Sequence, residues 1–132
     1  MSGAGNKGDA AGVASLLQKS KDNWDLSGEL RHKQLYDAAA NRLYYSLFQA
    51  VKAYAVNAGK LRVDDTVSVH ETLKRLVREE GMDFKTFGNA MNMRKTADYE
   101  PRRVSEFEFD QDFLCKADAL RQTFSGRVAK RR

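Results

Sequence analysis

Residues 39–54 read AANRLYYSLFQAVKAY, and this stretch decides the fold. Its apolar residues recur every three or four positions, which is the spacing of one face of an α-helix. One stripe holds Tyr36, Ala40, Leu43, Leu47, Val51 and Tyr54, and an adjoining stripe holds Tyr44, Phe48 and Ala55. An apolar sector of this width indicates a helix that packs against neighbours on several sides. The stretch therefore predicts the central helix of a bundle.

Working outward, the spacing predicts a first helix that begins at Asp9, packs through Trp24 and ends at the DLSG sequence of residues 25–28. The central helix is then expected to cover roughly residues 29–57. Gly59 follows it as a natural C-terminal stop.

Further helices are expected after a loop at residues 60–67. Ser68 and Glu71 have the spacing of a capping box, and Gly81 is placed to end the helix that they begin. Asp83 is a candidate cap for a fourth helix, which must end before Pro101 because proline disfavours helical geometry in the preceding residue.

Residues 102–109, RRVSEFEF, are expected to form a loop, although their partial alternation also suits a short extended piece. A last helix is expected from about residue 110. Its inward face would be made by Phe113, Ala117, Leu120 and Phe124. The fold class predicted from these patterns is all-α, an up-and-down bundle of four to five helices. The expected domain organisation is a flexible tail at 1–8, a helical domain at 9–126 and a basic tail at 127–132.

Composition narrows the class of protein and of partner. The chain of 132 residues has a formal charge of +5 and a pI near 9.4, which favours polyanionic partners, although 18 acidic residues are interspersed. The lone Cys115, expected to be buried, excludes an internal disulfide and fits a reducing compartment. We find no signal peptide and no membrane-spanning stretch, so we expect a cytoplasmic protein. The two histidines, His32 and His70, give no reason to expect a metal ion, and no cofactor is indicated.

A second stretch, MNMRKTADYEPRR at residues 91–103, carries the candidate chemistry. Arg94 lies three residues beyond Met91, on the apolar side of its helix, and Asp98 lies four residues further on. Arginine before the acid is the weaker order for a helical ion pair, and an aspartate in a last turn opposes the helix dipole. An arginine on an apolar face is either neutralised by a carboxylate or available to a phosphate.

Neighbouring residues extend this candidate phosphate site. Tyr99 offers a phenol, and Arg102 and Arg103 add charge just downstream. On the central helix, Arg42 and Tyr45 are three residues apart and present a cationic and phenolic edge. The alternative is that Tyr45 is a core residue and that Arg42 only extends its charge to solvent.

The two stretches together resemble the HEPN superfamily. AANRLYYSLFQAVKAY in a long second helix, followed by RKTADY near a later helix end, is similar to the small stand-alone bacterial and archaeal HEPN proteins, over roughly residues 10–125. The resemblance implies a helical bundle that forms a homodimer, with the arginine-bearing helix ends facing each other in a cleft. Many members are metal-independent endoribonucleases, several are toxins of toxin–antitoxin pairs, and others support a small nucleotidyltransferase.

The chain departs from the ribonuclease pattern of that superfamily at one position. Arg94 matches the motif arginine, but the window for the motif histidine holds Tyr99, Glu100 and Pro101. RNA cleavage needs a base and an acid that work near neutral pH, and an unperturbed tyrosine, with a pKa of about 10, is a poor base. Arg94 and Tyr99 are the tentative catalytic residues, with weak or absent ribonuclease activity expected.

Two functions follow as hypotheses, with a third as their alternative. The first is an RNA- or nucleotide-binding protein, in a toxin–antitoxin or defence system, whose site comprises Arg94, Asp98, Tyr99, Arg42 and Tyr45. The second is a non-catalytic partner or substrate of a small nucleotidyltransferase. The third is a helical adaptor whose charges form only a solvated face.

Overall fold

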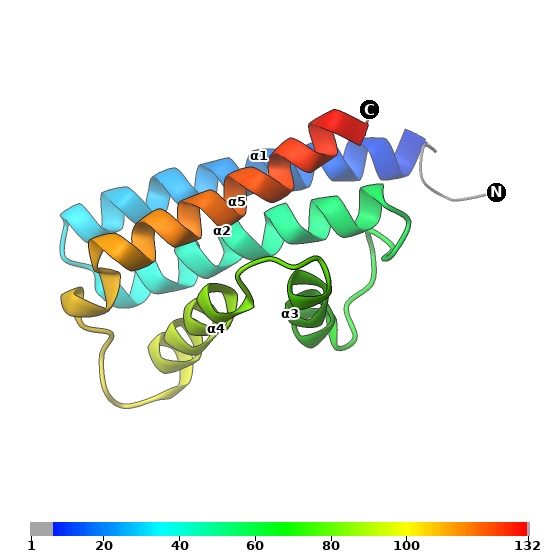
Figure 1. Cartoon of the computed structure of the whole chain (residues 1–132). Helices are drawn as coiled ribbons and strands as arrows, with labels where there is room; N and C mark the ends of the chain where they lie inside the picture. Colours follow the sequence, from blue (N-terminus) through cyan, green and yellow to red (C-terminus); the bar gives the residue numbers. More distant parts are fainter. Residues whose placement is uncertain (1–6, 132) are drawn as a thin grey trace.

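Six helical segments make up the protein, and no strand occurs within residues 7–131, which are the residues that the computed structural model describes. Three long helices lie side by side, and two shorter ones form a pair on the opposite side of α2 from α1 (Figure 1). The segments are α1 (Lys7–His32), α2 (Tyr36–Asn57), α3 (Val69–Glu79), α4 (Phe84–Tyr99), the 3-10 helix η1 (Glu106–Phe109) and α5 (Gln111–Arg131). The predicted all-α class is confirmed.

Helix α2 is the centre of the bundle, because it packs against α1, α3, α4 and α5. Both stripes predicted from the sequence face the core: most of their residues are buried, and Tyr36 and Phe48 are half-buried. Alanines between them allow the neighbouring helices to approach closely. The fully buried members include Ala39, Leu43, Tyr44, Leu47, Ala50, Val51, Ala53 and Ala55.

The predicted break at residues 25–28 is wrong, because α1 continues to His32. Ser27 is buried inside this helix, and its Oγ donates to the carbonyl oxygen of Ala39 at 2.9 Å, which fixes the segment against α2. The chain turns instead at residues 33–35, where Gln34 has a φ of 63°. Tertiary contact therefore outweighs the local preference of serine and glycine for a break.

Most of the other predicted helix ends are confirmed. Gly59 and Gly81 have φ angles of 75° and 73°, the left-handed conformation that terminates α2 and α3. Asp83 caps α4, since its Oδ1 accepts from the backbone N–H of Thr86 at 3.1 Å. The capping box at Ser68 is wrong: that residue has a left-handed φ of 55°, and its side chain makes no capping hydrogen bond.

The segment after α4 is a loop that ends in η1. Its backbone is attached to α2, because the N–H of Val104 donates to Asp37 Oδ1 at 2.8 Å. A capping box between Ser105 and Glu108 begins η1, so the expected loop contains a short helix, and the alternative of an extended piece is not found. Asp110 then accepts from the N–H of Phe113 at 2.8 Å, at the start of α5.

The helical domain extends beyond the boundary predicted at residue 126. Helix α5 continues to Arg131, Val128 is fully buried, and Arg127 Nη1 lies 2.8 Å from Glu80 Oε1. At the other end α1 already begins at Lys7, and the rest of the predicted tail, residues 1–6, lies outside the described residues, as does Arg132.

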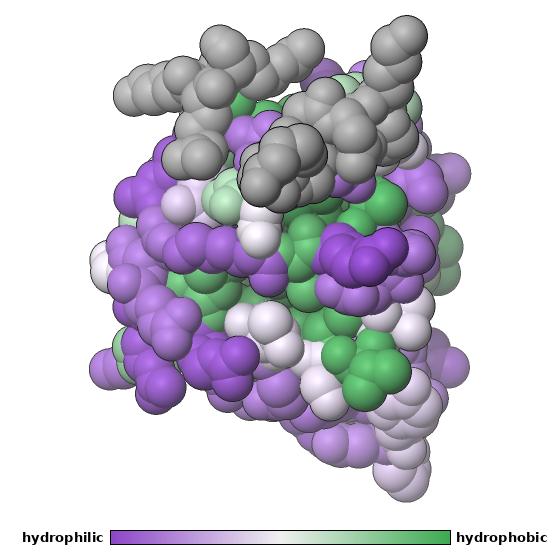
Figure 2. Space-filling view, turned by 90° about the vertical axis from the view of Figure 1, so that its right-hand side faces the viewer, coloured by the Kyte–Doolittle hydropathy of each residue, from purple (hydrophilic) through white to green (hydrophobic). Residues whose placement is uncertain are grey.

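The surface is charged and polar over most of the face drawn in Figure 2, with apolar side chains visible between the charged ones. Cys115, predicted to be buried, is exposed on α5, which corrects that expectation. Within the described residues, none of the helices combines the length and the apolar character needed to cross a membrane.

Candidate functional site

Arg94 lies at the centre of an aromatic cluster contributed by α2 and the end of α4. Its Cζ is 5.4 Å from the ring centroid of Tyr44 and 5.8 Å from those of Tyr45 and Tyr99. The residue is only 9% exposed, as its place on the apolar side of α4 predicts. Burial lowers the pKa of Arg94, but the neighbouring tyrosines and Asp98 outweigh it, so the guanidinium remains charged. A permanent cation is thereby held among phenol rings.

Asp98 joins α4 to α2 at this point. Arg94 Nη1 donates to Asp98 Oδ2 at 3.3 Å, and Asn41 Nδ2 lies 3.3 Å from each carboxylate oxygen. The Nε atom of Arg94 is buried and has no hydrogen-bond acceptor among the described residues. Asp98 therefore neutralises the guanidinium only in part and holds it from one side.

Arg42 reaches the same cluster through Asn41. Its Nε donates to Asn41 Oδ1 at 2.9 Å, and its Nη1 donates to Asn23 Oδ1 at 3.2 Å. The Cζ atom of Arg42 is 5.9 Å from the Tyr45 ring centroid. Two arginines thus contact Tyr45, and the structure brings together Arg42, Tyr45, Arg94, Asp98 and Tyr99.

His70, at the start of α3, belongs to the cluster although sequence reasoning did not assign it there. Its Nδ1 shares a hydrogen bond of 2.6 Å with the hydroxyl of Tyr44, and its ring centroid is 4.7 Å from that of Phe48 and 6.1 Å from that of Tyr45. Tyr44 and Tyr45 therefore each contact both His70 and Arg94. No spacing in the sequence could have indicated this, because His70 and Arg94 belong to different helices, α3 and α4, and no local pattern determines how these pack on each other and on α2.

Charges around His70 favour its neutral form. Burial lowers the pKa of His70, and the positive charges of Arg94 and Lys95 lower it further. Burial raises the pKa of Tyr44 well above its usual value, so its phenol stays protonated. The site at neutral pH thus contains an uncharged imidazole beside a charged guanidinium.

Arg102 and Arg103 have different surroundings. Arg102 forms ion pairs with Glu100 at 3.5 Å and Glu108 at 3.6 Å, and its Nη2 is 3.4 Å from Thr96 Oγ1. It lines a separate cavity with Phe113 and others, and Arg103 is exposed in the loop. Neither is brought into the Arg94 cluster by a contact within the described residues.

Within residues 7–131, no group of three His, Cys, Asp or Glu side chains is placed to hold a metal ion. The cluster around Arg94 combines two guanidinium groups, phenols, one neutral histidine and the carboxylate of Asp98.

Comparison with known proteins gives two findings. The chain matches the HEPN domain family over residues 13–124. It is also 28% identical over 91 residues to a curated protein of Methanocaldococcus jannaschii named "Putative toxin MJ0142", a match that covers 67% of this chain and 62% of that relative. The match therefore spans somewhat less than two thirds of the relative's length. The family match includes every residue of the Arg94 cluster, and the chain belongs to the HEPN domain family.

Proposed function

We propose that this toxin-like HEPN protein binds a phosphate group of RNA or of a nucleotide at the Arg94 cluster. The observation that carries the proposal is the convergence of α2, α3 and α4 on one nine-tenths-buried guanidinium. That guanidinium lies at the position of the motif arginine and has phenol rings around it. Phosphate oxygens suit the planar donors of arginine, and tyrosine rings suit a base or a ribose.

We further propose that cleavage of RNA by this site is weak or absent. Metal-independent cleavage requires a base for the 2′-hydroxyl and an acid for the leaving oxygen. Within the described part of one chain, the cluster offers one histidine, His70, and its Nδ1 is already hydrogen-bonded to Tyr44 at 2.6 Å. Tyr99 occupies the histidine window and is suited to position a phosphate. A homodimer, which the family resemblance implies, would place two such sites in a single cleft.

Binding can be tested with a fluorescein-labelled single-stranded RNA and measurement of anisotropy at several salt concentrations. We expect Arg94→Met to weaken binding by about tenfold or more and to lower the slope of log affinity against log salt by about 0.7, the value for one phosphate contact on a single strand.

Arg121→Met is the matched control for this test. Arg121 is also largely buried, pairs with Asp118 at 2.6 Å, stacks on Trp24 at 5.0 Å and has an unpartnered Nε, but it belongs to α5. Equal loss of binding in both variants would contradict a specific site at Arg94. Separately, rapid degradation of RNA in the presence of EDTA, abolished by Arg94→Met, would show that the site is an efficient nuclease and would refute the weak-cleavage proposal.

A second function is supported by the exposure of Tyr99. This residue is 75% exposed, although its ring centroid is only 5.8 Å from Arg94 Cζ. We propose as the alternative that a small nucleotidyltransferase uses Tyr99 as an acceptor: the phenol oxygen attacks the α-phosphorus of a nucleoside triphosphate, the phenol proton passes to solvent and pyrophosphate leaves. Arg94 would then hold the transferred phosphate. If a small nucleotidyltransferase is encoded beside this protein, incubation with that enzyme and ATP should add one nucleoside monophosphate at Tyr99, as read by mass spectrometry. Modification that persists in Tyr99→Phe would exclude this residue as the acceptor.

A further inference from the structure

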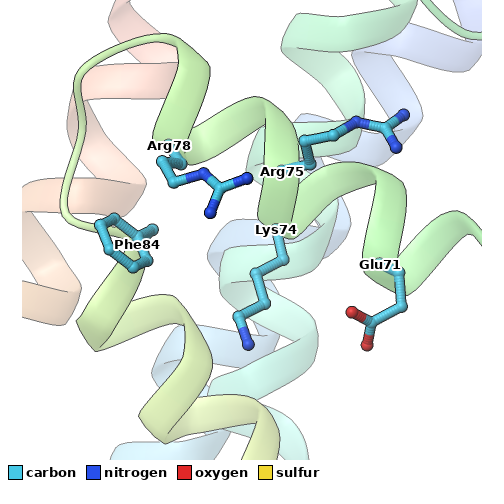
Figure 3. A pocket seen from close by; sticks show the side chains of 5 residues that line it. All are labelled: Glu71, Lys74, Arg75, Arg78 and Phe84. Atoms are coloured by element: carbon cyan, nitrogen blue, oxygen red, sulfur yellow. The ribbon is translucent and has the colours of Figure 1, made fainter.

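A second group of cations lies along α3, outside the Arg94 cluster. A cavity of about 260 Å³ opens between α3 and the start of α4, and it is lined by Glu71, Lys74, Arg75, Arg78 and Phe84. Figure 3 shows Lys74 extending from α3 toward α4, with Arg78 and Phe84 on the other side of the opening. Three cations and one carboxylate line this cavity, so it is electropositive.

Two of these cations are free of carboxylate partners within the described part of the chain. Arg75 is paired with Glu79 at 4.0 Å, whereas neither Lys74 nor Arg78 forms an ion pair there. Lysines on an ordinary solvated helix face are also often unpaired, so the absence of ion pairs does not by itself distinguish a binding site from a solvated surface.

Both side chains lie against α4. The Cζ of Arg78 is 5.9 Å from the centroid of the Phe84 ring, which orients the guanidinium at the cavity. Lys74 lies against Gly88, where an added Cβ would be 3.4 Å from its Cε and 3.7 Å from its Nζ. The glycine therefore leaves the space that the lysine occupies. Two oriented cations beside an aromatic ring match the way in which proteins hold a single-stranded nucleic-acid backbone.

His70 of the Arg94 cluster lies on the same helix as the two unpaired cations of the cavity. His70, Lys74 and Arg78 follow one another at intervals of four residues on α3, so each step rises about 6 Å along one side of the helix. Lys95, next to Arg94 on α4, is close enough to His70 to lower its pKa. Positive charge thus extends from Arg94 past His70 to the cavity.

We propose that the α3–α4 cavity is a second phosphate subsite, which binds the backbone of a single-stranded RNA whose neighbouring phosphate is held at Arg94. The proposal rests on the proposed function and adds to it a substrate class: an oligonucleotide that covers both sites, as opposed to a mononucleotide that fills the first alone. Lys74 and Arg78 are the phosphate-binding side chains of this subsite.

The test compares a mononucleotide 5′-phosphate with fluorescein-labelled single-stranded RNAs of increasing length. The variant is Lys74→Gln with Arg78→Gln, which removes two charges and retains good helix formers. The matched control is Lys19→Gln with Lys33→Gln, which removes two exposed charges, one on α1 and one in the turn directly after it; α1 lies on the other side of α2 from α3. Circular dichroism melting verifies that all variants are folded.

We expect the Lys74/Arg78 variant to bind the mononucleotide as the wild type does, and to bind the longer RNAs about tenfold or more weakly, with a salt slope lower by about 1.4. Wild-type affinity of this variant for long RNA, together with loss of binding in Arg94→Met, would overturn the second subsite and leave the first. Equal weakening by the α1 control would also overturn it, because the effect would then be one of net charge. Failure of the wild-type protein to bind any RNA would overturn both proposals.

Discussion

The hydrogen bond between Tyr44 and His70 offers the sharpest test of how the site is assembled. Tyr44 is fully buried, and its hydroxyl is 2.6 Å from His70 Nδ1, so the bond joins the centre of α2 to the first turn of α3. Tyr44→Phe removes one oxygen and keeps the ring that packs under Arg94. A neutral hydrogen bond contributes about 1 kcal/mol, and a partner left unsatisfied in a buried place adds about as much again. We therefore expect a loss of about 1–2 kcal/mol in the free energy of unfolding, which corresponds to a fall in Tm of about 4–8 °C.

The assay is a double-mutant cycle followed by urea or thermal unfolding. The single variants are Tyr44→Phe and His70→Leu, and their combination should recover about 1 kcal/mol or more relative to the sum of the two losses. Tyr54→Phe is the matched control: Tyr54 donates to Glu80 at 3.0 Å, at the opposite end of α3 from His70, and should be additive with His70→Leu. Additivity of Tyr44→Phe with His70→Leu would refute the bond, and with it the placement of His70 at the site. Binding of RNA by folded Tyr44→Phe should persist, because the guanidinium keeps its aromatic surroundings.

Three further outcomes are expected. By proton NMR, His70 should titrate below the ordinary value of 6.5, because burial and the charge of Arg94 lower its pKa, and Arg94→Met should raise it. The unfolded chain then binds a proton at His70 more readily than the folded chain does. His70 should therefore lower the free energy of unfolding as the pH falls below 6.5 and leave it unchanged above about pH 7. A His70→Gln variant whose stability has the same pH dependence as the wild type would contradict this prediction. Gly126→Ala, inside α5 with open space around it, should raise the free energy of unfolding by about 0.5–1 kcal/mol. Gly59→Ala, at a φ of 75°, should lower the free energy of unfolding by about 1 kcal/mol. A Gly126→Ala variant that melts below the wild type, together with a Gly59→Ala variant that melts above it, would refute both predictions. Cys115 is exposed, so its thiol should react with a disulfide reagent in the native protein, whereas reaction only after denaturation would place it in the core.

The fold could be read from the sequence wherever one local signal was decisive. The apolar stripes around Leu43 predicted a central helix, and α2 is packed by four other helices. Gly59 and Gly81 predicted helix ends because glycine readily adopts the positive φ that both positions have. The signal failed at Ser27, whose local preference for a break is outweighed by a bond to Ala39 that depends on how α1 docks on α2. The sequence contains no local trace of that bond.

At the candidate site too, the residues that are close in sequence could be predicted, whereas a contact from a distant part of the chain could not. Arg94, Asp98 and Tyr99 are close in sequence, and helical spacing placed the arginine on the apolar side of α4, where it is buried. Arg102 was predicted to belong to the site because it is also close to Arg94 in sequence, but it forms ion pairs with Glu100 and Glu108. His70 was set aside because a lone histidine at a helix start is usually structural or solvated, and the sequence cannot show whether folding brings it near Arg94. Closeness along the chain is thus a poor guide past a helix end, where the next few residues can turn in any direction.

Burial of Arg94 contributes little to the stability of the fold. A guanidinium that is nine-tenths buried, paired at 3.3 Å with one carboxylate and left with an unpartnered Nε, loses much of its hydration for modest compensation. An apolar residue on the same face of α4 would pack between Tyr44 and Tyr45 without that loss. Arg121 shows that such an arrangement can also be structural. Within the described chain, however, Arg94 differs from Arg121 in having an exposed Tyr99 and a neutral His70 beside it. A charge held at a cost to stability, next to groups accessible to a ligand, is the arrangement expected of a residue whose partner arrives from solution.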